Sequence, residues 1–289
     1  MIPQATNPSV TVIIPCYNSG RTLPFTLDSL RIQTYQPLEI IVIDDGSTDP
    51  DTIAYVDSLS DVRVVRQENK GLPSARNAGF RAAASRYVLP LDADDWLEPD
   101  AVAKLMHALL TNNDAHYTYS HMQLEGEAKG ILAKRYNFFE QLFFNQMPYC
   151  LMLPKALWAE IGGYDESMRR GYEDWDFNIR LGATGCTGVV VPEPLFHYRV
   201  SSGGMLLSTS TKHHGDLWRQ IQLKNRELFS PRTLIALWRR WRRRPSTYPL
   251  VFYFGWLSLH RLLPKRSFQA LFRQLMLRSH GRRVTERSR

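Results

Sequence analysis

The chain has 289 residues, of which 44% are hydrophobic and 22% are charged, a composition typical of a globular protein with a sizeable core. Three scattered cysteines argue against a disulfide framework or a zinc site and indicate a reducing cytosolic compartment, and neither a signal peptide nor an 18-residue apolar run is found. The net charge of +8 is uneven, because residues 231–289 hold 15 Arg and Lys against one Glu, which indicates an anionic membrane or a nucleic acid as a partner of this tail.

Strands and helices alternate along the first 110 residues. Continuous β-branched runs predict buried strands, and apolar residues at helical spacing predict helices between them. We expect strands over residues 10–15, 38–44, 62–66 and 87–91, and helices over residues 22–33, 51–59, 71–84 and 100–110. This alternation predicts a mostly parallel sheet that binds ligands beyond the carboxyl ends of its strands.

The remainder of the chain is less regular. A strand over residues 189–198 is expected to be broken by Pro192 and Pro194, and residues 201–211 are expected to form a mobile loop. Ser230 and Pro231 form a good N-cap and first-turn pair for a helix whose later part is basic and aromatic. The other expected elements are a strand over 115–122, helices over 137–144, 174–181 and 216–228, and a short apolar segment over 250–259.

Two groups of carboxylates directly follow predicted strands. Residues 91–95 read LDADD, and such close carboxylates repel one another unless a cation or a proton offsets their charge. Mg²⁺ or Mn²⁺ could bind there and neutralise a diphosphate, or the segment could simply be a solvated turn that caps the next helix. Residues 43–49 read IDDGSTD, where a carboxylate could accept a hydrogen bond from uracil or cap a turn. No glycine-rich phosphate loop occurs, which argues against a dehydrogenase or a P-loop enzyme.

Charged side chains also gather at the starts of two predicted helices. Lys70 and Arg76 flank the start of one, where a helix amino terminus favours anions, although a surface turn would have the same pattern. Residues 171–176 read GYEDWD, so that acidic groups open the other helix. They either cap that helix or supply a general base, which a sugar hydroxyl needs because it is a poor nucleophile.

Five segments, in their order along residues 10–199, resemble the family 2 glycosyltransferases, whose fold is called GT-A. They read VTVIIPCYNSGRTLPFTLDSL, EIIVIDDGSTD, ENKGLPSARNAGF, LPLDADDWLEPD and GGYDESMRRGYEDWDFNIRL. Each segment by itself is weak evidence for the family, whereas all five in this order are specific for it. The resemblance implies an α/β fold of GT-A type, a Rossmann-like, mostly parallel sheet flanked by helices, and beyond it we expect a helical basic C-terminal extension.

The resemblance implies a role for each matching position. Asp174 would be the catalytic residue that deprotonates the acceptor, with Glu173 and Trp175 beside it as acceptor-binding residues. Asp94 would ligate a divalent metal, Mn²⁺ or Mg²⁺, and Asp92 would contact the ribose or a metal-bound water. The residues implied to bind the nucleotide sugar are Pro15, Tyr17, Asn18, Asp44, Asp45 (on the base), Lys70, Gly71, Arg76, Asn77 and Asp92.

One position departs from the family pattern. After Tyr198 and Arg199 many relatives carry a histidine that helps to hold the metal, and Ser201 occupies that place here. Either fewer protein ligands hold the metal, or another histidine substitutes. The candidate substitutes are His197, His213 and His214.

The resemblance implies inverting transfer of a sugar from a nucleoside-diphosphate sugar, with UDP favoured, to a sugar or lipid-linked acceptor in surface polysaccharide or glycolipid assembly. The glycosyltransferase domain would span residues 1–205, divided near residue 100 into nucleotide-sugar and acceptor halves. Residues 206–289 would form the basic helical region, on anionic lipid at the inner face of the cell membrane, in a cytoplasmic protein without a nucleic-acid partner. The alternatives are a catalytically idle sugar-nucleotide binding module and, less favoured, a nucleic-acid binder that uses the basic tail.

Overall fold

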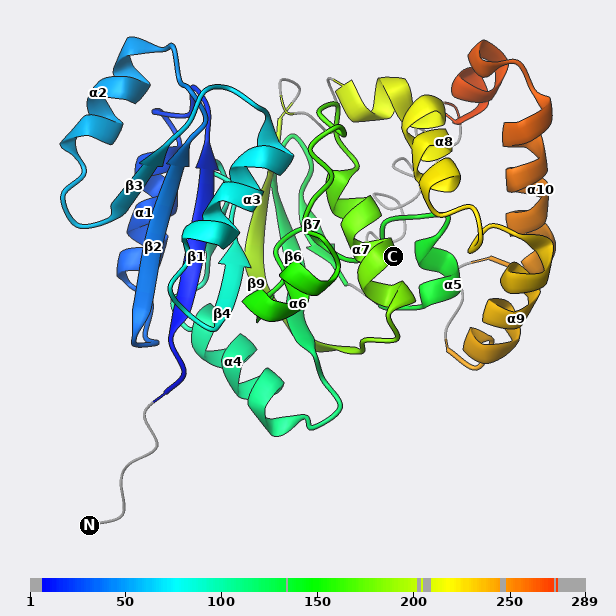
Figure 1. The fold of residues 1–289 in the computed structure, drawn as a ribbon, viewed down its shortest axis with the longest axis horizontal. Coiled ribbons are helices and arrows are strands. Elements are labelled where there is room, and N and C mark those ends of the chain that lie inside the picture. Colours follow the sequence, from blue (N-terminus) through cyan, green and yellow to red (C-terminus); the bar gives the residue numbers. More distant parts are fainter. Residues whose placement is uncertain are drawn as a thin grey trace, which may run out of the picture. The chain divides into compact units, whose positions relative to one another are not determined.

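A five-stranded sheet with strand order β3-β2-β1-β4-β8 lies in the first of two units (Figure 1). Strands β1 (Val10–Cys16), β2 (Leu38–Asp44), β3 (Arg63–Arg66) and β4 (Tyr87–Pro90) are parallel, and β8 (Leu153–Pro154) runs antiparallel to β4. Their β-branched residues are buried, as the sequence predicts. The expected α/β fold with a mostly parallel sheet is therefore confirmed.

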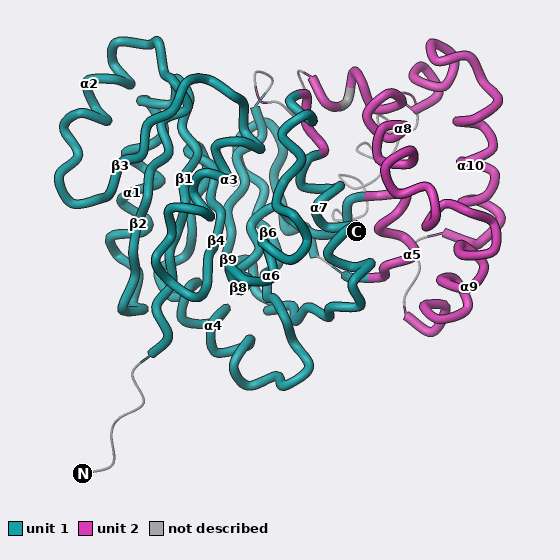
Figure 2. Tube along the Cα trace, in the orientation of Figure 1, with its two compact units in different colours: residues 1–136, 145–169, 173–201 teal, residues 137–144, 170–172, 202–289 magenta. Residues whose placement is uncertain are grey.

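Figure 2 shows the two units in different colours. Unit 1 comprises residues 1–136, 145–169 and 173–201, and unit 2 comprises residues 137–144, 170–172 and 202–289. The computed structural model describes residues 7–133, 135–201, 204, 209–244, 248–272 and 274. Most of the expected loop over residues 201–211 lies outside these ranges.

Side-chain alternation along β1 divides the core of unit 1 between the two faces of the sheet. Val10, Val12 and Ile14 pack in one apolar cluster with residues of α1 (Leu23–Arg31) and α4 (Ala101–Thr111). Ile13 points to the other face and packs with residues of α3 (Leu72–Ala82). Burying each such side chain stabilises the fold by about 1.5–3 kcal/mol, so both faces are held against helices.

A second sheet, with strand order β5-β9-β6-β7, completes the strands of unit 1. It consists of β5 (Trp96–Leu97), β6 (Tyr117–Gly126), β7 (Gly130–Leu132) and β9 (Gly188–Val200). The prediction that prolines break the strand near residue 190 is wrong, because β9 continues through them. Between β6 and β9, Ser120 pairs with Val191, and the next pair is Met122 with Phe196. The two prolines lie between these pairs, in a bulge where no ladder hydrogen bond is required.

The remaining helices of unit 1 are α2 (Pro50–Ser58), α6 (Lys155–Glu160) and α7 (Glu173–Ala183). Unit 2 contains α5 (Phe138–Gln141), the 3₁₀ turn η2 (Thr211–His213), α8 (His214–Lys224), α9 (Pro231–Trp241) and α10 (Leu250–Leu262). The predicted cap of α9 is confirmed, since Ser230 Oγ accepts from Thr233 N at 3.2 Å. Within the described ranges, none of the helices combines the length and apolar composition needed to cross a bilayer.

Candidate functional site

A cleft of about 550 Å³ opens in unit 1 at the carboxyl ends of β1, β2 and β4. Ligands of parallel α/β sheets bind at this edge. Strand β5, directly after the LDADD segment, pairs with β9 through Trp96 and His197, which ties the acidic turn to the second sheet. The cleft is lined by Asn18, Ser19, Arg21, Thr22, Asp49, Asp94, Arg199 and Ser201.

Asn18 joins the loops that follow β1 and β2. Its Oδ1 accepts from the backbone N–H groups of Thr48 at 2.8 Å and Asp49 at 2.9 Å. Its backbone has a positive φ of 52°, which asparagine adopts more readily than most residues. Of its predicted neighbours, Pro15 is buried in β1 and Tyr17 is 47% exposed. Asn18 therefore shapes the cleft, and the ring of Tyr17 is open to a ligand.

Arg76 connects the acidic turn to helix α7. Its guanidinium, on a side chain that is 2% exposed, donates from Nη2 to Asp92 Oδ1 at 2.8 Å and from Nη1 to Glu173 Oε1 at 2.7 Å. The ring of Tyr149 lies 4.6 Å from its Cζ atom. Burial acts to lower the pKa of Arg76, but the charges of Asp92 and Glu173 outweigh it and hold the pKa well above the ordinary value. Arg76 thus stays charged and fixes Asp92 by charge-assisted hydrogen bonds.

The other two carboxylates of the turn have different surroundings. Asp95 is fully buried and accepts from Tyr149 Oη at 2.5 Å and from Arg199 N at 2.7 Å, so it holds the turn together. Asp94 lines the cleft. Burial, and then the charge of Asp92, raise the pKa of Asp94 to about 6. Asp94 is the member of the turn whose charge a bound cation would stabilise most directly.

Asp174 lies in the first turn of α7, where Asn145 orients its carboxylate. Asn145 Nδ2 donates to Asp174 Oδ2 at 2.7 Å, and Asn178 Nδ2 donates to Asn145 Oδ1 at 3.2 Å. Burial, then the charges of the acidic turn and last that of Asp174, raise the pKa of Tyr198. Glu173, directly before Asp174, accepts from Arg76, which also donates to Asp92, so the start of α7 is tied to the acidic turn.

Glu173 and Trp175, which the resemblance implies bind the acceptor, are each 3% exposed. One carboxylate oxygen of Glu173 is bonded to Arg76, and its Oε2 has no hydrogen-bond partner among the described residues. Burial raises the pKa of Glu173 against the opposing charge of Arg76. Both side chains are therefore buried in the fold around α7. Their contact with an acceptor stays a prediction.

Asp45 anchors the segment that leads into α3. Its Oδ1 accepts from Lys70 N at 2.9 Å and from Gln67 Nε2 at 2.7 Å, while Oδ2 accepts from Gly71 N at 2.8 Å. Gly71, at the start of α3, has a φ of 91°, which other residues rarely adopt. The Lys70 side chain is exposed, and Asp44 Oδ1 accepts from Ser47 N at 3.0 Å. Asp45 is 3% exposed, and its hydrogen bonds shape this loop. The contact with the nucleotide base that the resemblance implies stays a prediction.

Replacing Asp45 with alanine is expected to lower the free energy of unfolding by about 2–4 kcal/mol, because three part-buried donors lose their acceptor and each unsatisfied donor costs about 1–3 kcal/mol at most. Chemical denaturation would measure the change. Asp49→Ala is the comparison for stability alone, since Asp49 caps α2 by accepting from Thr52 N at 2.9 Å and from Thr52 Oγ1 at 2.5 Å and should cost about 1 kcal/mol. A variant that keeps its stability and loses only nucleotide affinity would show that contact with the base is the main role of Asp45.

Both polar atoms of the Asn77 side chain form hydrogen bonds within unit 1. Its Nδ2 donates to Tyr164 O at 2.8 Å and to Glu166 Oε1 at 2.9 Å. Its Oδ1 accepts from Tyr164 N at 2.8 Å and from Trp158 Nε1 at 3.2 Å. Asn77 therefore holds the segment before α7 in place, and the contact with the donor that the resemblance implies is not visible in these bonds.

Two of the three candidate histidines have partners of their own. His197 Nε2 lies 2.8 Å from Glu98 Oε1, and its ring stacks on Trp96. His214, like His213, belongs to unit 2, where it is buried and stacks on Phe272 at 3.6 Å. Ser201, which replaces the family histidine, lines the cleft with Asp94. Across the described residues, no group of three or more His, Cys, Asp or Glu side chains could hold a metal.

Several residues of the site were not predicted from the sequence, and three of them hold its charged groups. Tyr149 and Asn145 lie in the irregular middle of the chain, where no periodicity marks them. Arg199 lies 5.4 Å above the ring of Trp96, and its Nε donates to Asp94 O at 3.0 Å. The only available signal was its position at the end of a predicted strand that follows the acidic turn.

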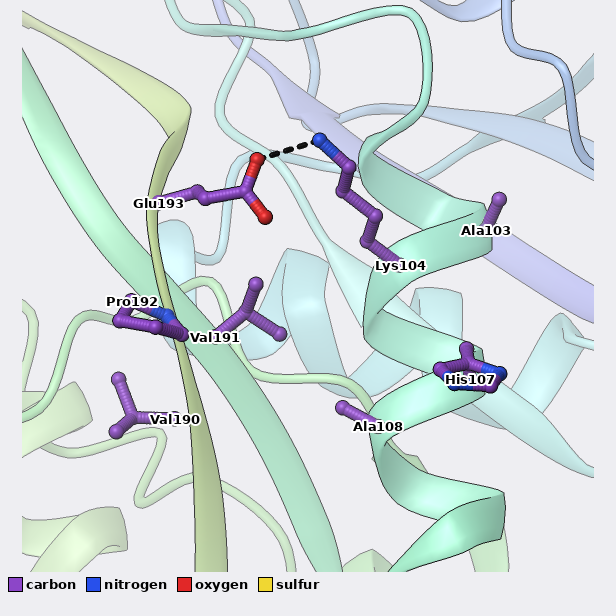
Figure 3. Close-up of a pocket in the computed structure, with 8 residues that line it drawn as sticks. All are labelled: Ala103, Lys104, His107, Ala108, Val190, Val191, Pro192 and Glu193. Carbon is purple, nitrogen blue, oxygen red and sulfur yellow. Dashed lines mark hydrogen bonds and ion pairs between the residues drawn. The ribbon is translucent and has the colours of Figure 1, made fainter.

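A separate hollow of about 400 Å³ lies between α4 and β9 (Figure 3). An ion pair between Lys104 Nζ and Glu193 Oε2, at 2.5 Å, crosses it. Its remaining walls are formed largely by small apolar side chains, and none of the predicted site residues lines it. The cleft beside Asp94 is the better candidate site.

Comparisons with known proteins agree with this geometry. The sequence profile described as glycosyl transferase family 2 matches residues 11–168, more than half of the chain. Glycosyltransferase GlyG of Streptococcus pneumoniae serotype 4 is 31% identical over 173 residues, which cover 58% of this chain and 52% of that protein. WfaP of Escherichia coli, a UDP-Glc:alpha-D-GlcNAc-diphosphoundecaprenol beta-1,3-glucosyltransferase, is 34% identical over 119 residues, 40% of this chain and 47% of that protein.

The chain thus spans about half the length of these two relatives. The structure of S. aureus TarS 1-349 in complex with UDP-GlcNAc has a TM-score of 0.60 at 20% identity and covers 74% of this chain and 66% of that one, a likeness of fold. Family profile, fold and the order of the strand-end carboxylates agree. The chain belongs to glycosyl transferase family 2.

Proposed function

We propose that this protein transfers a sugar from a nucleoside-diphosphate sugar to an acceptor hydroxyl with inversion at the anomeric carbon. The observation that supports the proposal is the link through Arg76, which donates to Asp92 of the acidic turn and to Glu173, the residue before Asp174. Asp94 of the same turn lines the cleft. Membership of family 2 supports the same chemistry.

UDP is the favoured carrier. The fold neighbour TarS is described in complexes with UDP and with UDP-GlcNAc, and the name of the relative WfaP specifies UDP-Glc. The diphosphoundecaprenol in the name of WfaP also supports a lipid-linked acceptor and a role in assembling a surface polysaccharide or glycolipid. An acceptor of that kind fits a cytoplasmic protein at the inner face of the cell membrane. The basic helix α9, with Arg239 and Arg240 in its last turn, would contact anionic lipid.

The residues at the cleft fit a divalent cation such as Mn²⁺ or Mg²⁺. Asp94 faces the cleft with a pKa raised to about 6, chiefly by burial, so a cation would offset an existing electrostatic penalty. One or two carboxylates completed by substrate phosphate oxygens are a usual ligand set for Mg²⁺. Both oxygens of Asp92 accept from Arg76, so Asp94 is the better direct ligand. When bound, the cation would supply charge neutralisation for the departing diphosphate.

The side chains of this chain would carry the rest of the reaction. Asp174, oriented by Asn145, takes the proton of the acceptor hydroxyl as its oxygen attacks the anomeric carbon. The bond from that carbon to the diphosphate oxygen breaks, and its electron pair leaves with the nucleoside diphosphate. Arg199, beside Asp94, lies where it can stabilise the negative charge that develops. A single displacement inverts the centre and needs no nucleophile on the protein.

Calorimetric titration of UDP, GDP and dTDP, each with and without Mn²⁺, would test the donor site. We expect one nucleotide to bind in a metal-dependent manner and Asp94→Ala to abolish the metal-dependent part of the affinity. Asp100→Ala is the control, because Asp100 forms a part-exposed ion pair with Lys104 after the acidic turn. If none of the nucleotides binds to the wild type under any condition, the proposed roles of Asp45 and Asp94 are wrong.

A further inference from the structure

A basic hollow of about 250 Å³ lies in unit 2, and none of the residues that line it has been assigned a role above. Its walls come from the second half of α8, the turn before α9 and the end of α10. The side chains that form it are Arg219, Gln222, Arg226, Phe229, His260 and Arg261, with Leu223 beside them.

The walls of this hollow carry positive charge without a compensating carboxylate. None of the lining residues is acidic, and within the described ranges Arg219, Arg226 and Arg261 form no ion pair. Asp216, the acidic residue of α8, is paired with Lys265 at 2.5 Å. Three guanidinium groups around one small space repel one another unless an anion lies between them.

The floor of the hollow is ordered and uncharged. His260 Nε2 lies 2.9 Å from Gly215 O, and because a carbonyl only accepts, this nitrogen carries the proton. His260 Nδ1 then accepts from Gln222 Nε2 at 3.1 Å. Burial, and then the charges of Arg219 and Arg261, lower the pKa of His260, so the field of the guanidinium groups reaches the floor. The recognition chemistry of the hollow is therefore set by its arginines.

We propose that this hollow binds a phosphate group, presented either by an anionic lipid headgroup or by a free phosphate compound. The planar guanidinium group presents a fork of donors that matches phosphate oxygens, and several such forks suit a group with more than one charge. Leu223 is 68% exposed beside the hollow, and Leu262, next to Arg261, is 81% exposed, so apolar surface borders the cationic site. The site lies wholly in unit 2 and does not rest on the proposed sugar transfer.

The double variant Arg219→Gln/Arg261→Gln tests this site against general electrostatic attraction. Its matched control is Lys212→Gln/Arg266→Gln, which removes the same charge from exposed positions of the same unit, outside α9 and outside the hollow. Binding of inorganic phosphate and diphosphate is measured by calorimetry. Binding to phosphatidylcholine vesicles with and without phosphatidylglycerol is measured by sedimentation.

We expect the hollow variant to bind at least one of these probes roughly tenfold more weakly than the wild type, since it loses the charge-assisted hydrogen bonds of two guanidinium groups to the phosphate. The control should change much less. A loss in the calorimetric arm identifies a free phosphate compound as the ligand, and a loss confined to vesicles that contain phosphatidylglycerol identifies a lipid. Equal losses in both variants, no loss in the hollow variant, or no binding of any probe by the wild type would overturn the site.

Discussion

Replacing Asp174 with asparagine is expected to slow sugar transfer by about 10²–10⁴-fold, the usual contribution of a positioned general base. Asparagine is nearly isosteric with aspartate, and its carbonyl oxygen can still accept from Asn145 Nδ2, which donates to Asp174 at 2.7 Å. The fold and the affinity for the nucleotide should therefore change little. Release of nucleoside diphosphate, measured with a saturating donor, reports the rate, and calorimetry reports the affinity.

Asp51→Asn is the matched control for this prediction. Asp51 also lies in the first turn of a helix, α2, and it is exposed, so the same change removes a similar interaction with the helix dipole without touching the site. Its transfer rate should equal that of the wild type. If the Asp174→Asn protein turns over at nearly the wild-type rate, another residue is the general base. If it loses affinity for the nucleotide while its rate is unchanged, Asp174 contacts the donor.

The second large effect is expected for Arg76→Met, which should lower the free energy of unfolding by about 3–5 kcal/mol. Methionine fills much of the volume of arginine, but it leaves the carboxylates of Asp92 and Glu173 without the cation that both contact. Glu173 is 3% exposed, so water cannot replace the lost partner. Chemical denaturation followed by tryptophan fluorescence would measure the loss.

Arg66→Met provides the comparison, because Arg66 also contacts two carboxylates, those of Asp44 and Asp57, but its side chain is 54% exposed. Exposed ion pairs contribute about 0–1 kcal/mol, so this variant should be nearly as stable as the wild type. The double variant Arg76→Met/Glu173→Gln should recover part of the lost stability, since it removes one stranded charge. Equal effects of Arg76→Met and Arg66→Met would mean that Arg76 does not brace the site.

Local patterns predicted the regular part of this protein well. The strands over residues 10–16 and 38–44 follow from continuous β-branched runs, and the helix after Ser230 follows from its cap and from Pro231. Short elements were missed, because β5 and β8 have two residues each and too few side chains to show a period. The bulge in β9 was missed for a related reason. Proline lacks a backbone N–H, but the sequence does not reveal whether the neighbouring strand has a carbonyl that requires this N–H.

The sequence by itself determined the alternating strands and helices and the positions of the acidic segments at strand ends, because residue spacing encodes both and parallel strands bring their carboxyl ends to one edge. The tertiary structure decided what each acidic residue does. Asp95 is bonded to Tyr149, Asp45 to the loop before α3, and Asp92 to Arg76, whereas Asp94 lines the cleft. These partners lie up to 54 residues away in the sequence, and burial and charge depend on such distant neighbours, which no local pattern specifies.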